Sequence, residues 1–256
     1  MAVMGRVLFL ALPGLAIAIA NAQAPAPLTP EQMELLESTR ESALRYSKSL
    51  PDFLCTEIIR RTEDPTNSNR WRNLDTLTVR VSYSGHEEYK LIRHDGRATD
   101  EEYESLAGTT SAGEFGTRLH DVFSPLSQAS FAWKGWSRVR HRRVAVFTYR
   151  VSRERSRNEV RLSEKRVIAG YHGEISVDPE SSTVIRITLN AELPAGFGIE
   201  ACSSSTEYDY RDVAGRSFLL PVESNATLAM GRYRAANHIE FRDYRKFQTE
   251  ATITFK

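Results

Sequence analysis

The sequence lacks the residue patterns that mark familiar enzymes and metal proteins. It has two cysteines and six histidines in 256 residues, and no His-Glu-x-x-His sequence, P-loop or dinucleotide-binding glycine pattern occurs. The histidines are scattered, and no His or Cys pair has the spacing of metal ligands. The sequence therefore predicts no metal site, no cofactor and no catalytic residues.

A large excess of charge of one sign is also absent. The net charge is +1, so bulk charge does not indicate a nucleic-acid partner. One segment differs, because residues 134–166 carry twelve Lys and Arg against three Glu, a local charge of +9. One interpretation is a basic rim, formed by Arg153, Arg155, Arg157 and Arg161, that binds anionic lipid headgroups, a polyanion or an acidic partner. The interpretation that we favour is a solvated strand edge whose positive charges oppose edge-to-edge association.

Long hydrophobic runs are missing except at the N-terminus. Arg6 precedes an apolar run that ends at Ala20, and Ala20-Asn21-Ala22 has the small-x-small pattern of a signal-peptide cleavage site. The run is interrupted by Pro13-Gly14 and is shorter than the roughly 20 residues of a membrane anchor. We expect residues 1–22 to be a signal peptide and residues 23–29 a tether. The mature protein is then soluble and exported, either to the periplasm or to the extracellular medium.

The scarcity of cysteine leaves one possible disulfide. Cys55 and Cys202 are the two candidates, and an exported protein meets an oxidising environment in which they could pair. The alternative is two buried free thiols, which behave as small apolar side chains. The sequence leaves both alternatives open.

Helical patterns occur in two places. Thr29 and Gln32 form a capping box ahead of an amphipathic helix over residues 30–48. Residues 99–123 contain two further capping boxes, which begin at Thr99 and Ser111, and predict two short helices, the second over residues 112–123 with Phe115 on its apolar stripe. These helices are expected to cover one face of a sheet.

Most of the remaining chain alternates with the period of β-strands. The clearest example is a hairpin at residues 167–189, whose odd positions are apolar and whose turn is Asp178-Pro179-Glu180-Ser181. About ten or eleven such strands are joined by short turns, and no composition shift marks a second domain. The prediction is one mainly β (α+β) domain over residues 30–256, a single curved antiparallel sheet or half-barrel with an N-terminal helix and short inserted helices.

The hairpin also carries a family resemblance. Its phrase from Tyr171 to Asp178, followed by Thr183 and Arg186-Ile187, resembles the periplasmic lipoprotein carriers and sensors of the LolA, LolB and RseB type. That resemblance implies a curved sheet that wraps helices around an acyl-chain cavity, and a lipid or lipoprotein partner. Residues 111–116 and 218–221 are similar to phrases of uncharacterised secreted bacterial proteins. The resemblance transfers no catalytic residue.

Three hypotheses for function follow from these observations. The first is an exported, non-enzymatic protein that binds a lipid or another apolar ligand within the curved sheet. The second is an envelope interaction module with a filled core, which acts through its surface and basic rim. The third is a hydrolase, which requires a Ser, a His and a carboxylate to converge in one cleft.

Overall fold

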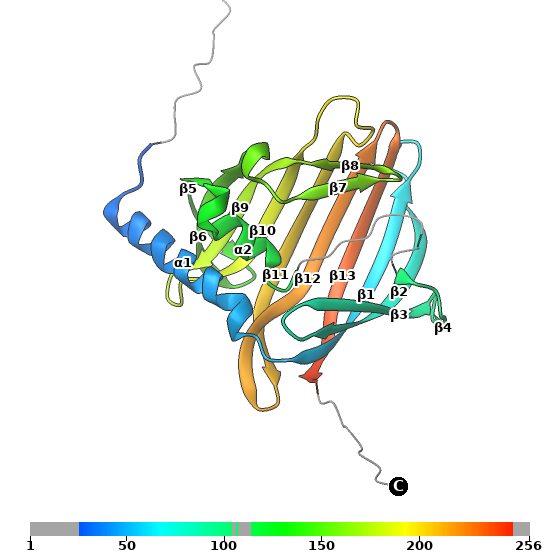
Figure 1. The fold of residues 1–256 in the computed structure, drawn as a ribbon, viewed down its shortest axis with the longest axis horizontal. Helices are drawn as coiled ribbons and strands as arrows, with labels where there is room; N and C mark the ends of the chain where they lie inside the picture. The colour runs from blue at the N-terminus through cyan, green and yellow to red at the C-terminus, as the bar shows by residue number, and fades with distance from the viewer. Residues whose placement is uncertain (1–25, 104–105, 107–113, 248–256) are drawn as a thin grey trace, which may run out of the picture.

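The computed structural model describes residues 26–103, 106 and 114–247, and it is built mainly of antiparallel strands (Figure 1). The strands are β1 (Phe53–Asp64), β2 (Arg72–Tyr83), β3 (Glu87–His94), β4 (Arg97–Ala98), β5 (Ser130–Val139), β6 (Arg142–Val151), β7 (Glu159–Leu162), β8 (Lys165–Ile168), β9 (Gly170–Asp178), β10 (Thr183–Glu192), β11 (Ala201–Val213), β12 (Arg216–Met230) and β13 (Tyr233–Lys246). The helical elements are α1 (Pro30–Ser49), α2 (Thr117–Phe123), and the 3₁₀ turns η2 (Pro125–Ser127) and η3 (Arg153–Arg155).

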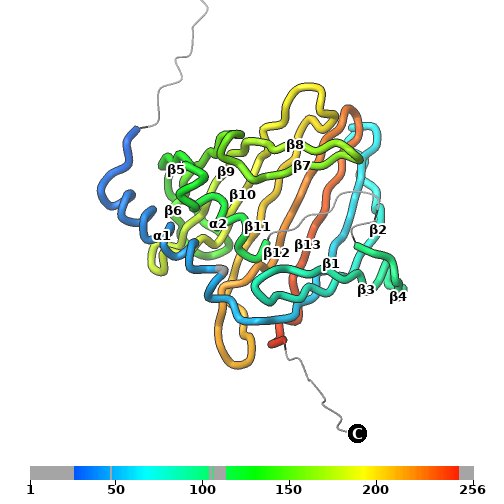
Figure 2. Tube along the Cα trace, in the orientation of Figure 1, coloured from blue at the N-terminus to red at the C-terminus, as the bar shows by residue number. Residues whose placement is uncertain are grey.

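Eleven strands form one sheet in the order β4-β3-β2-β1-β13-β12-β11-β10-β9-β6-β5, and β7 pairs with β8 in a separate two-stranded sheet. The first long strand β1 lies beside the last strand β13, so the first and last strands of the chain are neighbours within the sheet (Figure 2). The sheet is not closed, because β4 and β5 stand at opposite ends of this order. The predicted fold class, a single large antiparallel sheet with an N-terminal helix, is confirmed.

Helix α1 forms where the sequence predicts it. The Thr29 hydroxyl accepts the Gln32 backbone N–H at 3.3 Å, and the Gln32 side chain accepts the Thr29 N–H at 3.0 Å. This pair satisfies two helix-end donors that would otherwise lack partners. The helix ends at Ser49, because Leu50 is extended ahead of Pro51. Neither helix of the described part of the chain has the length and apolar character needed to cross a bilayer.

The prediction for residues 99–123 was partly wrong. Residues 99–102 are not helical, and the Thr99 hydroxyl accepts the Glu101 N–H in a local turn instead. Ser111 lies outside the described residues, and the second helix covers only Thr117–Phe123. Its N-cap is Gly116, at a left-handed φ of 106°, without a side-chain cap. The physical reason is tertiary: Phe115 is buried in the core, 1% exposed, and the helix begins only after it.

The hairpin at 167–189 also needs two corrections. Val167 belongs to β8 rather than to the first arm, which begins at Gly170. On the second arm a β-bulge lies between Val184 and Arg186, so the odd positions do not share one face. Ile185 packs in a small cluster with three valines of the β5–β6 hairpin, whereas Ile187 joins the main core. The predicted turn is confirmed, since the Glu180 N–H donates to the Asp178 carboxylate at 3.0 Å.

Helices α1 and α2 and the β7–β8 hairpin lie on the same side of the sheet (Figure 1). We call the covered side the inner face and the opposite side the outer face. Two large apolar clusters fill the inner face. One joins α1 and α2 to β6, β9, β10 and β11, and the other joins β1, β2, β3 and β13 to Phe115. The β7–β8 hairpin covers a smaller cluster next to β11 and β12.

Candidate functional site

The inner face beneath α1 and α2 is an apolar surface that two short elements cover. Helix α1 contributes Leu36, Ala43 and Tyr46, and α2 contributes Leu119, Val122 and Phe123, all buried. The sheet contributes aromatic and aliphatic side chains to the same cluster: Ala145, Phe147, Tyr149, Val151, Tyr171, Ile175, Val177, Val184, Ile187, Leu189, Tyr208 and Leu219. Such a surface can bind an apolar ligand where a covering helix moves away from it.

Phenolic hydrogen bonds connect both covers to the sheet. The Tyr46 hydroxyl of α1 donates to the Leu219 carbonyl of β12 at 2.8 Å. The Tyr208 hydroxyl of β11 donates to the Glu114 carbonyl, just ahead of α2, at 3.0 Å. Burial raises the pKa of both tyrosines above the ordinary phenol value, so both remain neutral donors. The covers are therefore held by side-chain packing and a few side-chain hydrogen bonds.

A polar cluster interrupts the inner face near Phe115. Glu57 of β1 is only 2% exposed, and its Oε1 has no hydrogen-bond partner in the described part of the protein. Burial is the main cause that raises the pKa of Glu57 far above its usual range, and the charges of Glu114 and Glu87 add to it. Burial therefore favours the protonated form of Glu57.

Phe115 lies beside this cluster in a cage of aromatic rings. Its ring centroid is 5.3 Å from that of Phe53 and 5.6 Å from that of Phe241, and Tyr83 stands at 6.4 Å. The Phe115 N–H donates to the Glu87 carboxylate at 3.2 Å. One carboxylate thus holds the chain at the point where Phe115 enters the core.

Sequence reasoning missed Glu57, although a signal was present. Phe53, Cys55 and Ile59 alternate along the strand and are all buried. The same parity places residue 57 on the inner face, so a glutamate there predicts a buried carboxyl.

The outer face carries an open hollow of about 580 Å³ over β5, β6, β9 and β10. His172 and Glu174, for which the sequence alone named no partner, point into it. The His172 Nδ1 lies 3.0 Å from Glu192 Oε1, and the Arg150 guanidinium lies 2.9 Å from Glu192 Oε2. Glu174 pairs with Lys134. The partners come from β10 and β5, on either side of β9 in the sheet order, which sequence spacing does not reveal.

Ser130 lines the same hollow, so a Ser, a His and a carboxylate do share one cleft. In the strand register, Ser130 pairs with Arg150 and Arg150 pairs with His172. The arginine strand therefore lies between the hydroxyl and the imidazole, and no hydrogen bond joins the two within the described residues. A nucleophile needs a base within hydrogen-bond reach, so this group is an ion-pair network rather than a hydrolytic triad.

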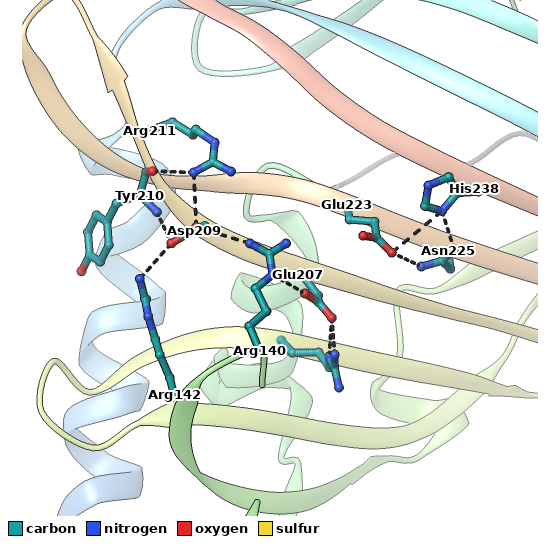
Figure 3. A network of polar contacts seen from close by, with 10 residues as sticks. Arg140, Arg142, Glu207, Asp209, Tyr210, Arg211, Glu223, Asn225 and His238 are labelled. Carbon is teal, nitrogen blue, oxygen red and sulfur yellow. Dashed lines mark hydrogen bonds and ion pairs between the residues drawn. The ribbon is translucent and has the colours of Figure 1, made fainter. Parts of the chain in front are cut away.

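A second polar network lies near the β5–β6 turn (Figure 3). Asp209 accepts hydrogen bonds from three arginines, Arg140, Arg142 and Arg211. Glu207 pairs with both Arg140 and Arg186. Farther along the sheet, Asn225 and Glu223 contact His238. These charged groups are balanced by opposite charge and partly solvated, so they stabilise the fold only weakly.

The structure divides the basic segment between the two ends of β6. Arg153 and Arg155 lie in η3, Arg157 follows it, and Arg161 lies in β7. All four are exposed, and Arg161 pairs with Glu159. The basic residues of the β5–β6 turn stand at the other end of the strand, about 30 Å away for ten extended residues. The four predicted rim arginines thus form a local group of their own.

Both cysteines are free thiols, and they lie in different places. Cys55 is buried in the cluster around Phe115, and Cys202 is half-buried against the β7–β8 cluster. Burial raises the pKa of both thiols, which makes them poor nucleophiles. Among the described residues, no three His, Cys, Asp or Glu side chains are arranged to hold a metal ion.

No family model matches the sequence, and no curated protein matches it. Solved structures do resemble it. A LolA superfamily protein from Nitrosomonas europaea is 10% identical, with a TM-score of 0.42, over 86% of this chain and 97% of that one. A DUF1329 family protein from Desulfovibrio piger is 8% identical, with a TM-score of 0.42, over 85% and 94% of the two chains.

A putative outer-membrane lipoprotein-sorting protein domain from Vibrio parahaemolyticus is 8% identical, with a TM-score of 0.41, over 87% of this chain and 93% of that one. The LolA type is the one that the sequence resembles, and a LolA superfamily protein is among these similar structures. At these identities and TM-scores the similarity supports no conclusion about function, which has to be argued from the residues of this chain.

Proposed function

We propose that this chain is an exported, non-enzymatic protein that binds an apolar ligand, such as a lipid or the acyl chains of a lipoprotein, between the inner face of the sheet and its covering helices. The observation that carries the proposal is the way in which the inner face is covered. The covers are bonded to the sheet by side chains, whereas each strand of the sheet is bonded to its neighbours by backbone ladders.

Displacing a cover is therefore much easier than opening the sheet. A ligand that moves α1 aside exposes the aromatic and aliphatic surface beneath it, and the ligand's own apolar area replaces the contacts that the helix loses. The exposed Met33 and the partly buried Leu35 and Leu44 of α1 move with the helix, and the Leu219 carbonyl loses the Tyr46 hydroxyl as its donor.

The test compares two tyrosines that donate to neighbouring carbonyls of β12. Tyr46 of the cover bonds Leu219 at 2.8 Å, and Tyr244 of the sheet bonds Pro221 at 2.7 Å. A hydrogen bond contributes about 1 kcal/mol, so Tyr46→Phe should raise the rate of Nile red uptake by roughly fivefold. The control Tyr244→Phe should leave the rate within about twofold.

Native mass spectrometry of protein purified from the export compartment, followed by lipid extraction, completes the test. Stoichiometric lipid supports the proposal. Repeated absence of lipid, together with no Nile red uptake by the wild type or by Tyr46→Phe, would overturn it.

The exposed charges of η3 and β7 favour a second candidate, an interaction module. The observation behind it is the exposed basic group of Arg153, Arg155, Arg157 and Arg161, which suits an anionic membrane surface or an acidic protein partner.

A further inference from the structure

The β7–β8 hairpin is a cover of the inner face that is separate from the large sheet. Its two strands pair with each other in a sheet of their own, and the hairpin lies across the inner face next to β11 and β12 (Figure 1). Among the described residues, no hydrogen bond joins residues 159–168 to the eleven-stranded sheet. Side-chain packing alone therefore holds the hairpin against the inner face.

The underside of the hairpin is apolar. Val160 is 9% exposed and belongs to the same buried cluster as Phe197, in the connection between β10 and β11. Leu162 and Val167 pack against that cluster. Leu162 comes so close to Gly198 that a Cβ at residue 198 would lie 2.8 Å from Leu162 Cδ2. Moving the hairpin away would expose both its own apolar side chains and the cluster beneath them.

The covered cluster is continuous with the surface beneath α1 and α2. Ala191 of β10 packs against both clusters. Cys202 of β11, with Leu228 and Met230 of β12, extends the apolar surface under the hairpin. An opening at the hairpin would therefore give an apolar ligand a lateral route to the inner face that leaves α1 in place.

The opposite side of the hairpin is basic and carries one exposed apolar side chain. Arg161 lies directly opposite Arg166 in the strand register, and both are exposed. Like charges in this position destabilise a strand pair. Arg161 pairs with Glu159, whereas Arg166 has no ion pair among the described residues. Ile168 is 38% exposed and lies opposite Glu159. Such a surface is complementary to the headgroups and the interface of an anionic bilayer.

Hydrogen bonds close the base of the hairpin on itself. The Ser156 hydroxyl donates to the Ala169 carbonyl at 2.6 Å, and the Ala169 N–H donates to the Asn158 carbonyl at 2.9 Å. The Asn158 N–H donates to the Ser156 hydroxyl at 2.9 Å. Because these bonds lie within the segment, the hairpin can move as a unit without breaking them.

We propose that the β7–β8 hairpin is a gate that docks on an anionic bilayer and opens there, so that an apolar ligand passes between the bilayer and the inner face. This inference rests on the proposed function and specifies the partner surface and the entry route of the same site.

The bilayer favours the open state because it contacts more of the hairpin in that state. The arginines contact headgroups whether the hairpin is closed or open, whereas Val160, Leu162 and Val167 contact acyl chains only when it is open. A partner shifts a conformational equilibrium by this difference in contacts. An acidic protein surface supplies the charge but no apolar interior for the underside of the hairpin.

Cys202 is a native reporter for the movement. Its thiol is free and half-buried in the covered cluster, whereas the other free thiol, Cys55, is 2% exposed in a different cluster. Iodoacetamide is uncharged and should alkylate Cys202 of the mature chain roughly tenfold faster with phosphatidylglycerol vesicles than with phosphatidylcholine vesicles. Alkylation of Cys55 should differ by less than about twofold. Peptide mass spectrometry follows the two thiols separately.

Two charge variants separate the gate from general electrostatics. Arg161→Gln with Arg166→Gln should remove the acceleration by phosphatidylglycerol, with alkylation in the absence of vesicles within about twofold of the wild type. Arg138 and Arg143 form another directly opposed arginine pair, on β5 and β6. Arg138→Gln with Arg143→Gln is therefore the matched control, and it should retain the acceleration.

A packing variant checks that the hairpin limits access to the reporter. Leu162→Ala removes apolar contact from the underside, so it should speed alkylation of Cys202 without vesicles by at least about threefold. An unchanged rate would mean that the hairpin does not control access to the cluster, which would overturn the gate.

The remaining outcomes distinguish the gate from the proposed function. Equal alkylation of Cys202 with the two kinds of vesicle, or acceleration that persists in the Arg161 and Arg166 variant, would overturn the gate. The proposed function would still stand if the protein binds Nile red. Equal acceleration by poly-L-glutamate would overturn the bilayer as the partner in favour of an acidic protein. Acceleration in a protein that never binds Nile red would overturn the proposed function and, with it, the passage of a ligand.

Discussion

Carboxyl groups have different surroundings on the two faces of the sheet. On the outer face, carboxylates such as Glu207, Asp209 and Glu240 each contact arginines and remain partly solvated. On the inner face, Glu57 is buried and its Oε1 has no hydrogen-bond partner among the residues that the structure describes. The charged side chains of the outer face are explained by solvent exposure and by ion pairs between strands, without a ligand. The buried carboxyl has no such explanation, so it points to function.

The largest effect should come from removing apolar bulk from the inner face. Phe147 of β6 is fully buried, and Phe147→Ala should lower the free energy of unfolding by about 3–5 kcal/mol because it leaves a cavity. Its neighbour Thr148 points to the outer hollow, and Thr148→Ala should cost less than about 1 kcal/mol. Urea denaturation measures both. Equal losses would mean that the two faces do not differ as described.

The next effect is the pH dependence that Glu57 contributes. Its pKa in the folded protein lies above its value in the unfolded chain, mainly through burial. The contribution of Glu57 to stability is therefore fully present at pH values below the unfolded pKa. Stability should then fall as pH rises from about 4.5 toward the folded pKa, by at most about 1.4 kcal/mol per pH unit. Urea denaturation between pH 5 and 8 should show that Glu57→Gln removes this slope. An unchanged slope would show that Glu57 is ionised in the fold.

Glu240 on the outer face should behave with the opposite sign. Hydrogen bonds from Arg60 and Arg242 lower its pKa to about 2, so its contribution is present above the unfolded pKa. It should be lost as pH falls from about 4.5 to 2, and should amount to less than about 1 kcal/mol because the pair is partly solvated. Thermal unfolding of the wild type and of Glu240→Gln across that range measures this contribution. A stability difference between them that appears only at higher pH and is lost there would contradict the expected sign.

The smallest effect on stability is expected at the basic rim. Reversing the charge of Arg155, Arg157 and Arg161 together should change the free energy of unfolding by less than about 0.5 kcal/mol, because all three are exposed. The same triple variant should bind anionic vesicles less well at low salt, as measured by co-sedimentation.

A control for the rim lies at the other end of β6. Charge reversal of Arg138, Arg142 and Arg143 changes the net charge equally, so a matched loss of vesicle binding in that variant would assign the effect to overall charge. Unchanged co-sedimentation of the rim variant would remove the rim from the interaction hypothesis.

Much of the fold could be predicted because each strand carries its own pattern. Leu77, Val79, Val81 and Tyr83 alternate in the sequence, and all four are buried on β2. Helix α1 was predictable because its start and stop signals are local. Strand number and sheet direction followed from such patterns and from short connections.

The parts that failed depend on distant partners. The bulge at Ile185 is set by the pairing of β10 with β9, and the late start of α2 is set by the rings that enclose Phe115. The site was harder still to predict. Alternation along β1 shows which face of the sheet Glu57 lies on, but it does not show that carboxyl groups from β3 and from the segment ahead of α2 lie near it. Spatial neighbours of this kind have no signature in one sequence.

The open ends of the sheet have a mechanical consequence. Because β4 and β5 are both terminal strands, the curvature of the whole array can relax by small changes in twist between neighbours without breaking a ladder of backbone hydrogen bonds. The separation between the inner face and its covering helices can change with that curvature. Under the proposed function, ligands of different thickness would then contact the same side chains, which a fully closed barrel of strands would not allow.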